Sequence, residues 1–361
     1  MATQAKPRLH YFDMMKGVAI FMVVMGHVLT MCVREIDRAP LFKFIAQTHM
    51  PLFFFISGWF TYKVSAEGRT IIPKLGSRAV QLLLPMVVVS SLWIWYFPHS
   101  GIQSPLNSTF AGLWGDAWKN GYWFTLTLFI IIAIYAAICP VLSRVRGAIG
   151  SIVVVAVAWA VLYALKFYIF PAAENQWTNV ICLEQVTSFF PAFMMGALGR
   201  RYREGFMAAV HNSWCQTMAM VVLGVSIYVC CWPWEFGMEA ETQVIVSVAL
   251  HISLALIVMN VFEAWSDKAF APGRQQPGRF AAMWEYIGTQ SLAIYLLHYF
   301  FLFPMGAMRP WLVDVNLSFV PLVLFTMFWA SVIVSVVLAA VKMLEPSHVL
   351  TLLLTGKKIK K

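Results

Sequence analysis

A lysine and a histidine on one apolar stretch are the residues whose types and spacing point first to chemistry. The stretch Tyr11–His27 reads Y-F-D-M-M-K-G-V-A-I-F-M-V-V-M-G-H. Lys16 and His27 are eleven positions apart. That separation is about three turns of α-helix, so both side chains lie on one face, about 16 Å apart along the axis. Ionisable residues inside a membrane helix usually face a cavity and mark a functional site. We predict that His27 is catalytic; the alternative is a buried histidine satisfied by a neighbouring helix.

Three more ionisable residues lie at a depth similar to that of His27 within their own apolar segments. They are His49, Glu184 and His298. Each would be costly if it faced lipid, so we expect all four to share hydrogen bonds around one cavity. Glu184 could orient an imidazole or share its proton. His251 lies nearer the middle of its segment, and we interpret it as a core residue.

The opposite end of this arrangement is basic. Lys16 is joined there by Lys74 and Arg78, which are four positions apart and share a face if their helix begins early enough. These cations predict a site for an anion, although ordinary positive charge at the cytoplasmic surface is the alternative.

An anion site and a histidine along one helix suit a coenzyme A thioester. The cations would hold the phosphates, and the long pantetheine arm would lie along the helix. The thioester would then reach His27, where a neutral imidazole can act as general base on an acceptor hydroxyl near pH 7. Acyl-coenzyme A is thus the expected co-substrate.

The composition shows which elements must position these residues. The chain of 361 residues is 60% hydrophobic and 12% charged, with a mean hydropathy of +0.73. Soluble proteins carry about 25% charged residues, so an all-α, polytopic membrane protein is predicted. The six cysteines show no metal-ligand spacing and imply no disulfide framework, and no metal is expected.

Ten apolar segments are long enough to be membrane spans, within a single domain. The predicted spans are 14–33, 43–62, 79–97, 122–139, 149–170, 179–199, 215–232, 242–262, 284–303 and 319–341. Residues 1–13 form the N-terminal segment, 14–341 the helical bundle and 342–361 a basic tail. The first apolar segment is not followed by a small-residue cleavage pattern, so we expect a retained helix rather than a signal peptide.

The basic residues predict the orientation of the spans. Of the 26 Lys and Arg residues, only six fall on one side of the predicted bundle: Arg34, Arg38, Lys43, Lys119, Lys166 and Arg309. The other 20 fall on the side of both termini, which the positive-inside rule makes cytoplasmic. The net charge of +10 therefore indicates a membrane surface and lipid rather than nucleic acid. Tryptophans gather on the opposite side as an interfacial belt, and Trp114 and Trp118 are an alternative sugar-stacking platform.

Five blocks spread along the chain resemble the membrane acyltransferase-3 family. They are Arg8–His27, His49–Gly58 (H-M-P-L-F-F-F-I-S-G), Tyr122–Phe129 (Y-W-F-T-L-T-L-F), Phe189–Gly196 (F-F-P-A-F-M-M-G) and Ser291–His298 (S-L-A-I-Y-L-L-H). The resemblance implies a multi-pass enzyme of the inner (cytoplasmic) membrane. It would move an acyl group, commonly acetyl, from cytoplasmic acyl-coenzyme A to a glycan or a lipid-linked sugar.

The resemblance also implies roles for residues. His27 takes the place of the family's catalytic histidine, and a basic residue, usually arginine, stands where Lys16 does. The family's paired arginines before the third helix appear here as R-A-V-Q, so only Arg78 matches. The predicted catalytic residues are His27, Glu184 and His298. The predicted donor- and substrate-binding residues are Lys16, Arg78, Lys74, His49, Ser57, Trp123 and Tyr295.

Two other classes of function remain open. Ionisable residues in a cavity also suit a proton-coupled secondary transporter, although the sequence shows no internal repeat. A non-catalytic assembly scaffold would leave the aligned polar residues without a purpose. Capsule, lipopolysaccharide, peptidoglycan, a periplasmic glucan and a lipid-linked sugar are all possible acceptors.

Overall fold

The secondary structure of the protein is helical. The computed structural model describes residues 9–32, 39–65, 70–99, 109–169, 177–231, 240–271, 277–302 and 319–356. Within these ranges the only β-type pairing is one isolated bridge between Val64 and Thr70, so the all-α prediction is confirmed. The predicted N-terminal segment up to residue 8 and the end of the basic tail from residue 357 lie outside the described residues.

The helices follow the predicted spans with additional short elements between them. They are α1 (His10–Cys32), α2 (Pro40–Thr61), α3 (Leu75–His99), α4 (Phe110–Gly115), η2 (Lys119–Gly121), α5 (Trp123–Arg144), α6 (Ala148–Ala164), η3 (Leu165–Ile169), α7 (Trp177–Val180), α8 (Leu183–Arg201), α9 (Arg203–His211), α10 (Ser213–Cys231), α12 (Ala240–Ala269), α13 (Arg279–Thr289), α14 (Ser291–Leu297), α15 (Tyr299–Leu302), α17 (Phe319–Leu344) and α18 (His348–Thr355).

Six helices in the described part of the chain are long and apolar enough to cross a membrane. They are α1, α3, α5, α10, α12 and α17. The chain is thus a multi-pass membrane protein, and the count of ten crossings stays a prediction.

Two predicted spans are not single helices. The span 284–303 is divided into α13, α14 and α15, with breaks at Gln290 and His298. The span 179–199 begins with the short α7, and Cys182 then adopts a left-handed conformation (φ 51°) before α8 starts. Non-helical backbone at membrane depth is tolerated only where protein or a water-filled cavity surrounds it, so both breaks indicate sites inside the bundle.

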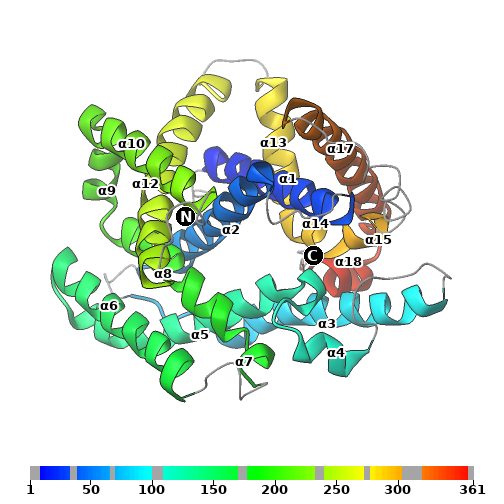
Figure 1. The fold of residues 1–361 in the computed structure, drawn as a ribbon, viewed down its shortest axis with the longest axis horizontal. Helices are drawn as coiled ribbons and strands as arrows, with labels where there is room; N and C mark the ends of the chain where they lie inside the picture. Colours follow the sequence, from blue (N-terminus) through cyan, green and yellow to red (C-terminus); the bar gives the residue numbers. More distant parts are fainter. Residues whose placement is uncertain are drawn as a thin grey trace, which may run out of the picture.

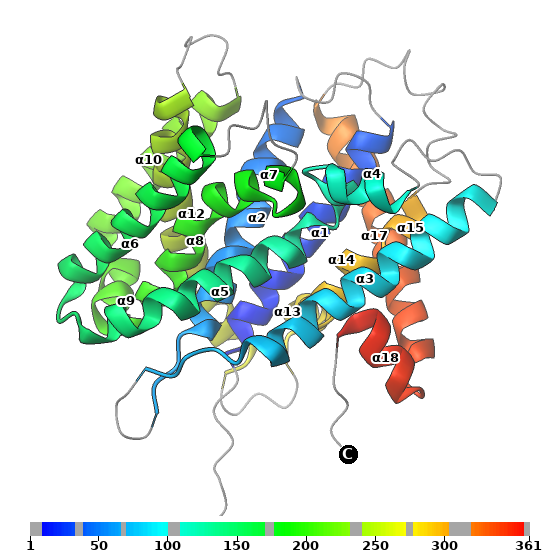
Figure 2. The same ribbon diagram turned by 90° about the horizontal axis from the view of Figure 1, so that it is seen from below.

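The first two helices occupy the centre of the bundle. Figure 1 shows α1 and α2 crossing in the middle, with the remaining long helices arranged around them. In Figure 2, α9 and α18 lie at one end of the bundle, whereas α4 and α7 lie toward the other. At the start of α1, His10 stacks on Phe270, which directly follows α12, and lies 2.9 Å from Glu285 of α13.

Two reciprocal pairs of glycines allow the central helices to touch their neighbours directly. Gly17 of α1 packs against α13, and Gly288 of α13 packs against α1; Gly58 of α2 and Gly196 of α8 repeat this arrangement. A Cβ atom at any of the four would lie between 1.7 and 2.1 Å from a carbonyl oxygen of the facing helix. Only glycine permits such close backbone contact. These crossings fix α1 against the broken segment that carries His298.

Candidate active site

His27 lies where α1 meets the break between α14 and α15. Its ring centroid is 5.2 Å from that of His298 and 4.8 Å from that of Tyr299. The hydroxyl of Tyr299 lies 2.9 Å from Nε2 and 3.2 Å from Nδ1 of His27. The predicted proximity of His27 and His298 is therefore present, and Tyr299 joins them.

The tautomer of His298 follows from its hydrogen bond. Its Nδ1 lies 2.9 Å from the carbonyl oxygen of Ile294, and a carbonyl can only accept, so Nδ1 carries the proton. Nε2 is then the acceptor nitrogen. It is fully buried and has no hydrogen-bond partner within the described residues. His298 thus presents a basic nitrogen inside the protein beside the ring of His27.

His49 comes from α2 on another side of the same region. Its Nδ1 donates to the carbonyl of Ile45, one turn earlier on the helix, which assigns the same tautomer as in His298. His49 also lies within electrostatic range of His27. Two of the four ionisable residues expected to converge, His27 and His298, are therefore in ring contact.

The fourth residue, Glu184, lies elsewhere, and the prediction that it shares the cavity of His27 is wrong. Its side chain is 55% exposed and forms an ion pair with Lys166 of η3, with 2.5 Å between Nζ and Oε2. The physical reason is the break before α8, because the left-handed Cys182 restarts the helix at Leu183 and places Glu184 in its first turn. Glu184 lines a separate cavity beside α6 and α12.

Tyrosine hydroxyls and main-chain atoms hold the broken segment in place. Tyr295 of α14 donates to the carbonyl of Gly121 over 2.6 Å and accepts from the amide of Phe124 over 3.1 Å. Tyr122 donates to the carbonyl of Leu296 over 3.2 Å. These bonds tie α14 to the start of α5, so the position of His298 depends on the loop that precedes α5.

That loop is fastened by a buried lysine. Lys119 is completely buried, and its ammonium group donates to the carbonyls of Trp114, Asp116 and Asn179 over 2.8, 2.8 and 2.6 Å. All three of its donors are used. The next residues include Gly121, where a Cβ atom would lie 1.6 Å from the hydroxyl oxygen of Tyr299. The loop therefore packs directly onto the tyrosine that contacts His27.

A cavity of about 320 Å³ runs along the predicted face of α1. Lys16, Ile20 and Val23 line it at helical spacing, and His27 is the next residue on that face. Arg78, Ser57 and Tyr295 line the same cavity, so four of the predicted donor-binding residues are brought together. The polar side chains of Thr61, Gln81 and Ser291 were not predicted and also face it.

The two cations of this cavity already have intramolecular partners. Lys16 Nζ lies 2.6 Å from Asp13 Oδ1, and an Arg78 guanidinium nitrogen donates to Gln81 Oε1 over 3.0 Å. The side chain of Lys16 is 26% exposed, which leaves it able to exchange its partner for a ligand anion.

The other three predicted donor-binding residues, His49, Lys74 and Trp123, do not line the cavity. Lys74 is exposed and precedes α3, where its carbonyl accepts the amide hydrogen of Arg78. Trp123 is part of the core, stacked on Phe189 with 5.3 Å between ring centroids. Since α3 begins at Leu75, Lys74 has no place on its helical face, and the predicted pairing of Lys74 with Arg78 on one face is wrong.

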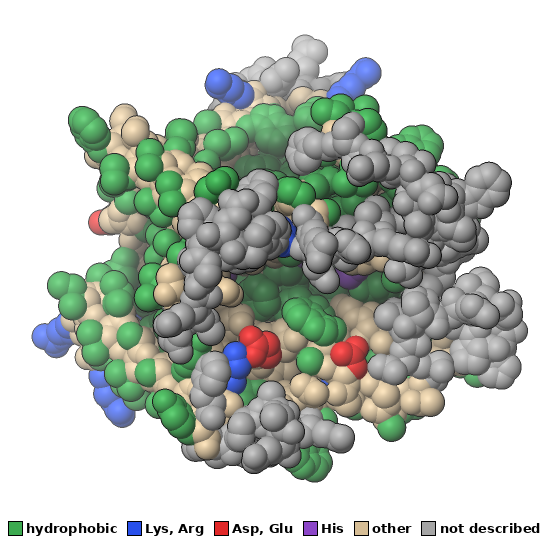
Figure 3. All heavy atoms as spheres, in the orientation of Figure 1, with side chains coloured by type: hydrophobic (Ala, Val, Ile, Leu, Met, Phe, Trp, Pro, Cys, Tyr) green, Lys and Arg blue, Asp and Glu red, His purple; other side chains and the backbone are tan. Residues whose placement is uncertain are grey.

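One face of the molecule is hollowed. Figure 3 shows the face that carries α4 and α7, with a depression near its centre walled by hydrophobic side chains. A histidine and a basic side chain are visible within the depression. Polar side chains are thus visible on this face among hydrophobic ones.

Sequence comparisons place the chain in a family. The sequence matches the family model described as "Acyltransferase domain" over residues 9–340. It is 33% identical over 135 residues to the Nodulation protein NolL of Sinorhizobium fredii. The aligned segment covers 35% of this chain and 36% of that protein. It is 33% identical over 155 residues to the Nodulation protein NolL of Mesorhizobium japonicum, with 41% of this chain and 40% of that protein covered. The match thus spans less than half the length of either relative, and no solved structure matches. With the family model matching nearly its whole length, the chain belongs to the membrane acyltransferase-3 family.

Proposed function

We propose that the protein transfers an acyl group from cytoplasmic acyl-coenzyme A to a hydroxyl of a cell-envelope glycan or lipid-linked sugar. Acetyl is the proposed group, and the inner membrane is the proposed location. The observation that carries the proposal is the cavity that follows α1 from Lys16 toward His27. A thioester with a charged head and a long arm matches a cavity that is cationic at one end and whose α1 wall reaches Val23, one helical turn before His27.

The donor would lie along this cavity with its phosphates at the basic end. Lys16 and Arg78 supply the positive charge, and Ser57, Thr61 and Gln81 supply hydrogen-bonding groups beside them. Lysine is a compact charge that cannot form the two parallel hydrogen bonds of arginine, so Arg78 is the residue able to grip a phosphate through two nitrogens. The apolar stretch beyond, with Ile20 and Val23, suits the pantetheine arm.

The transfer step needs one base. His27 accepts the proton of the acceptor hydroxyl as its oxygen attacks the thioester carbonyl; the carbon–oxygen bond forms and the carbon–sulfur bond breaks. Coenzyme A leaves with the proton returned from the imidazolium, as the thiol. The hydroxyl of Tyr299 orients the His27 ring, and the neutral imidazole of His298 lies beside it. Glu184 does not act on the His27 imidazole, because its carboxylate lies in a separate cavity.

The proposed topology places donor and acceptor on opposite sides. With both termini cytoplasmic and ten crossings, the Lys16 end of the cavity faces the cytoplasm. The α4 and α7 end then faces outward, toward the glycan.

Transfer can be measured in inside-out membrane vesicles from cells that express the protein, which contain their own acceptors. Labelled acetyl-coenzyme A supplied to the exposed cytoplasmic face should place label on the glycan fraction, and mild alkali should release it as from an ester. Vesicles with inserted protein but no label in any fraction would contradict the proposal.

The interrupted helices also suit a proton-coupled transporter, because α7–α8 and α14–α15 resemble the broken helices of such proteins. The same vesicles separate the two functions. A transporter would move protons with its solute and leave acetyl-coenzyme A unused, whereas the acyltransferase would release free coenzyme A in proportion to the ester formed.

A further inference from the structure

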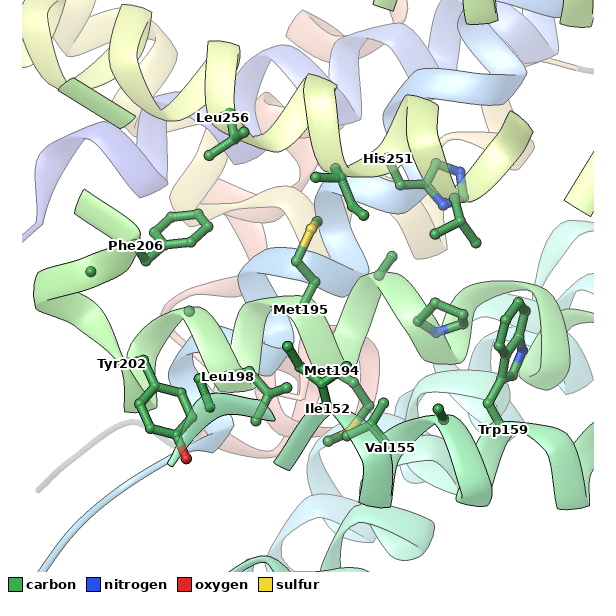
Figure 4. A pocket seen from close by; sticks show the side chains of 18 residues that line it. Ile152, Val155, Trp159, Met194, Met195, Leu198, Tyr202, Phe206, His251 and Leu256 are labelled. Atoms are coloured by element: carbon green, nitrogen blue, oxygen red, sulfur yellow. The ribbon is translucent and has the colours of Figure 1, made fainter. Parts of the chain in front are cut away.

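A long apolar cavity lies outside the central helices, between α6, α8, α9 and α12. Its volume is about 580 Å³, within the range of about 300–1,000 Å³ usual for small-molecule sites. Figure 4 shows Ile152 and Val155 of α6 on one side and Leu256 of α12 on the other, with Met194 and Met195 of α8 between them. Flexible methionines and branched aliphatic side chains suit an alkyl chain.

This apolar cavity has a direction. Trp159 and His251 lie at one end, whereas Tyr202 and Phe206 lie at the other, beside α9 (Figure 4). Trp159 and His251 also line a second cavity of about 470 Å³, so the two spaces adjoin. In the proposed topology α9 is at the cytoplasmic end, and the second cavity is therefore nearer the outer surface.

The second cavity is polar where the first is apolar. It contains the ion pair of Lys166 and Glu184, the amide of Gln185 and the indole rings of Trp118 and Trp159. Fixed charges and amides that form hydrogen bonds, beside aromatic faces that stack on apolar ring surfaces, are groups that bind a sugar.

Two buried polar side chains lining the second cavity have unused hydrogen-bonding atoms. Gln185 is 1% exposed, and neither its Oε1 nor its Nε2 has a partner within the described residues. His251 is 7% exposed, and its Nδ1 likewise has none there. Buried polar atoms are nearly always paired with protein, water or ligand. These atoms therefore point to a polar ligand group in this space.

We propose that the adjoining cavities bind one lipid-anchored glycan, with its alkyl chain between α6, α8 and α12 and its sugar against Lys166, Glu184 and Gln185. The position also relates it to the donor. Gln47 and Pro51 of α2 line this site, whereas Phe53 and Ser57 of the same helix line the donor cavity, so α2 is their shared wall. This proposal rests on the proposed function, and it makes the bound lipid the acyl acceptor.

Photolabelling tests the site. The full chain in lipid nanodiscs is exposed to an alkyl β-glucoside with a diazirine at the end of its chain. An alkyl phosphocholine with the same chain and diazirine serves as the matched probe. The glucoside should label peptides of α6, α8 and α12 several-fold more than the phosphocholine does. Equal labelling by both probes would mean that ordinary membrane lipid fills the space, and would overturn the proposal.

One variant tests the chain-binding cavity. Ala156 lines it, and its exposed neighbour Val157 does not. Each methylene excluded from an apolar site weakens binding about fourfold. Ala156→Trp fills the space of several methylenes of the bound chain, so it should lower glucoside labelling more than about tenfold. Val157→Trp should leave the labelling unchanged. Equal effects of the two substitutions would contradict the assignment.

A second variant tests the head-group cavity. Gln185→Met keeps the shape of the side chain and removes its unpaired polar atoms, so the fold should tolerate it. Both probes should label this variant equally, because the preference for the sugar depends on the amide of Gln185. A preference that survives in Gln185→Met would overturn the role of Gln185.

Photolabelling and acetyl transfer are separate assays, so the glycolipid site can be tested apart from the proposed function. The probes should label His27→Ala as they label the wild type. Wild-type protein that transfers acetyl groups but shows no glucoside preference would overturn the glycolipid site alone. Wild-type protein that labels as expected but transfers nothing would overturn the acceptor role together with the proposed function.

Discussion

A single hydroxyl, that of Tyr299, contacts the imidazole of His27, with 2.9 Å to Nε2 and 3.2 Å to Nδ1. A phenol can donate to the nitrogen that lacks a proton or accept from the one that carries it. The ring of His27 is thus restrained by a residue 272 positions later in the chain, across the break at His298.

Tyr299→Phe should lower kcat while leaving KM for acyl-coenzyme A unchanged. The substitution keeps the ring packing and removes one hydrogen bond of about 0.5–1.5 kcal/mol, equivalent to about 2- to 12-fold. Steady-state kinetics on protein normalised for quantity measures both constants. Tyr286→Phe, at an exposed tyrosine of α13, is the control and should change neither. An unchanged kcat in Tyr299→Phe would show that the hydroxyl does not act on His27.

The Lys16–His27 relationship could be predicted from the sequence because it depends only on helical periodicity within one continuous helix. α1 runs unbroken from His10 to Cys32, and the cavity follows the expected face. Arg78 and Tyr295 reach the same cavity from other helices. Arg78 was predicted from the basic cluster and from the family's arginine, whereas Tyr295 was predicted from a family block.

The misplaced Glu184 and the unpredicted Tyr299 occur where helices break. Glu184 and Tyr299 each follow such a break within an apolar run that reads as a continuous helix. The left-handed Cys182 and the turn at His298 have no marker such as glycine or proline at those positions. A break depends on tertiary contacts, such as the hydrogen bonds that Tyr122 and Tyr295 make across 174 residues, and these are not visible in local sequence.

Lys16→Ala should raise the apparent KM for acyl-coenzyme A. A charge-assisted contact to phosphate contributes about 1.5–3 kcal/mol, equivalent to roughly 10- to 150-fold. Lys16→Arg should be tolerated, because arginine keeps the charge. Lys74→Ala is the matched control, since that lysine is exposed and outside the cavity. A normal donor KM for Lys16→Ala would assign Lys16 to anchoring the helix at the interface.

Gly17→Ala should lower the midpoint of thermal unfolding sharply or prevent folding. The new methyl group would lie 2.1 Å from the carbonyl oxygen of Trp284, so α1 and α13 would have to separate. Gly224→Ala in α10 is the control, because nothing lies within 4 Å of the added atom. That change should be neutral or stabilise by up to about 1 kcal/mol. Equal midpoints for both variants would contradict the close crossing.

A reporter fused after Lys361 that is active only outside the cytoplasm should give no signal. The prediction follows from the charge distribution, with 20 of the 26 basic residues on the side of both termini. The same reporter inserted between residues 101 and 108 should be active. Strong activity after Lys361 would contradict the predicted cytoplasmic C-terminus. No activity at the second insertion together with activity after Lys361 would reverse the proposed direction of the donor cavity.

The most direct test of the acyltransferase mechanism is the rate at which His27→Ala transfers label from acetyl-coenzyme A in membrane vesicles. Loss of a general base lowers the rate about 10²- to 10⁴-fold. The variant should therefore be nearly inactive at wild-type protein levels, with its thermal unfolding midpoint little changed. His348→Ala, at an exposed histidine of α18, should transfer at the wild-type rate. Near-normal transfer by His27→Ala would contradict the assignment of His27 as the base and leave it a packing residue.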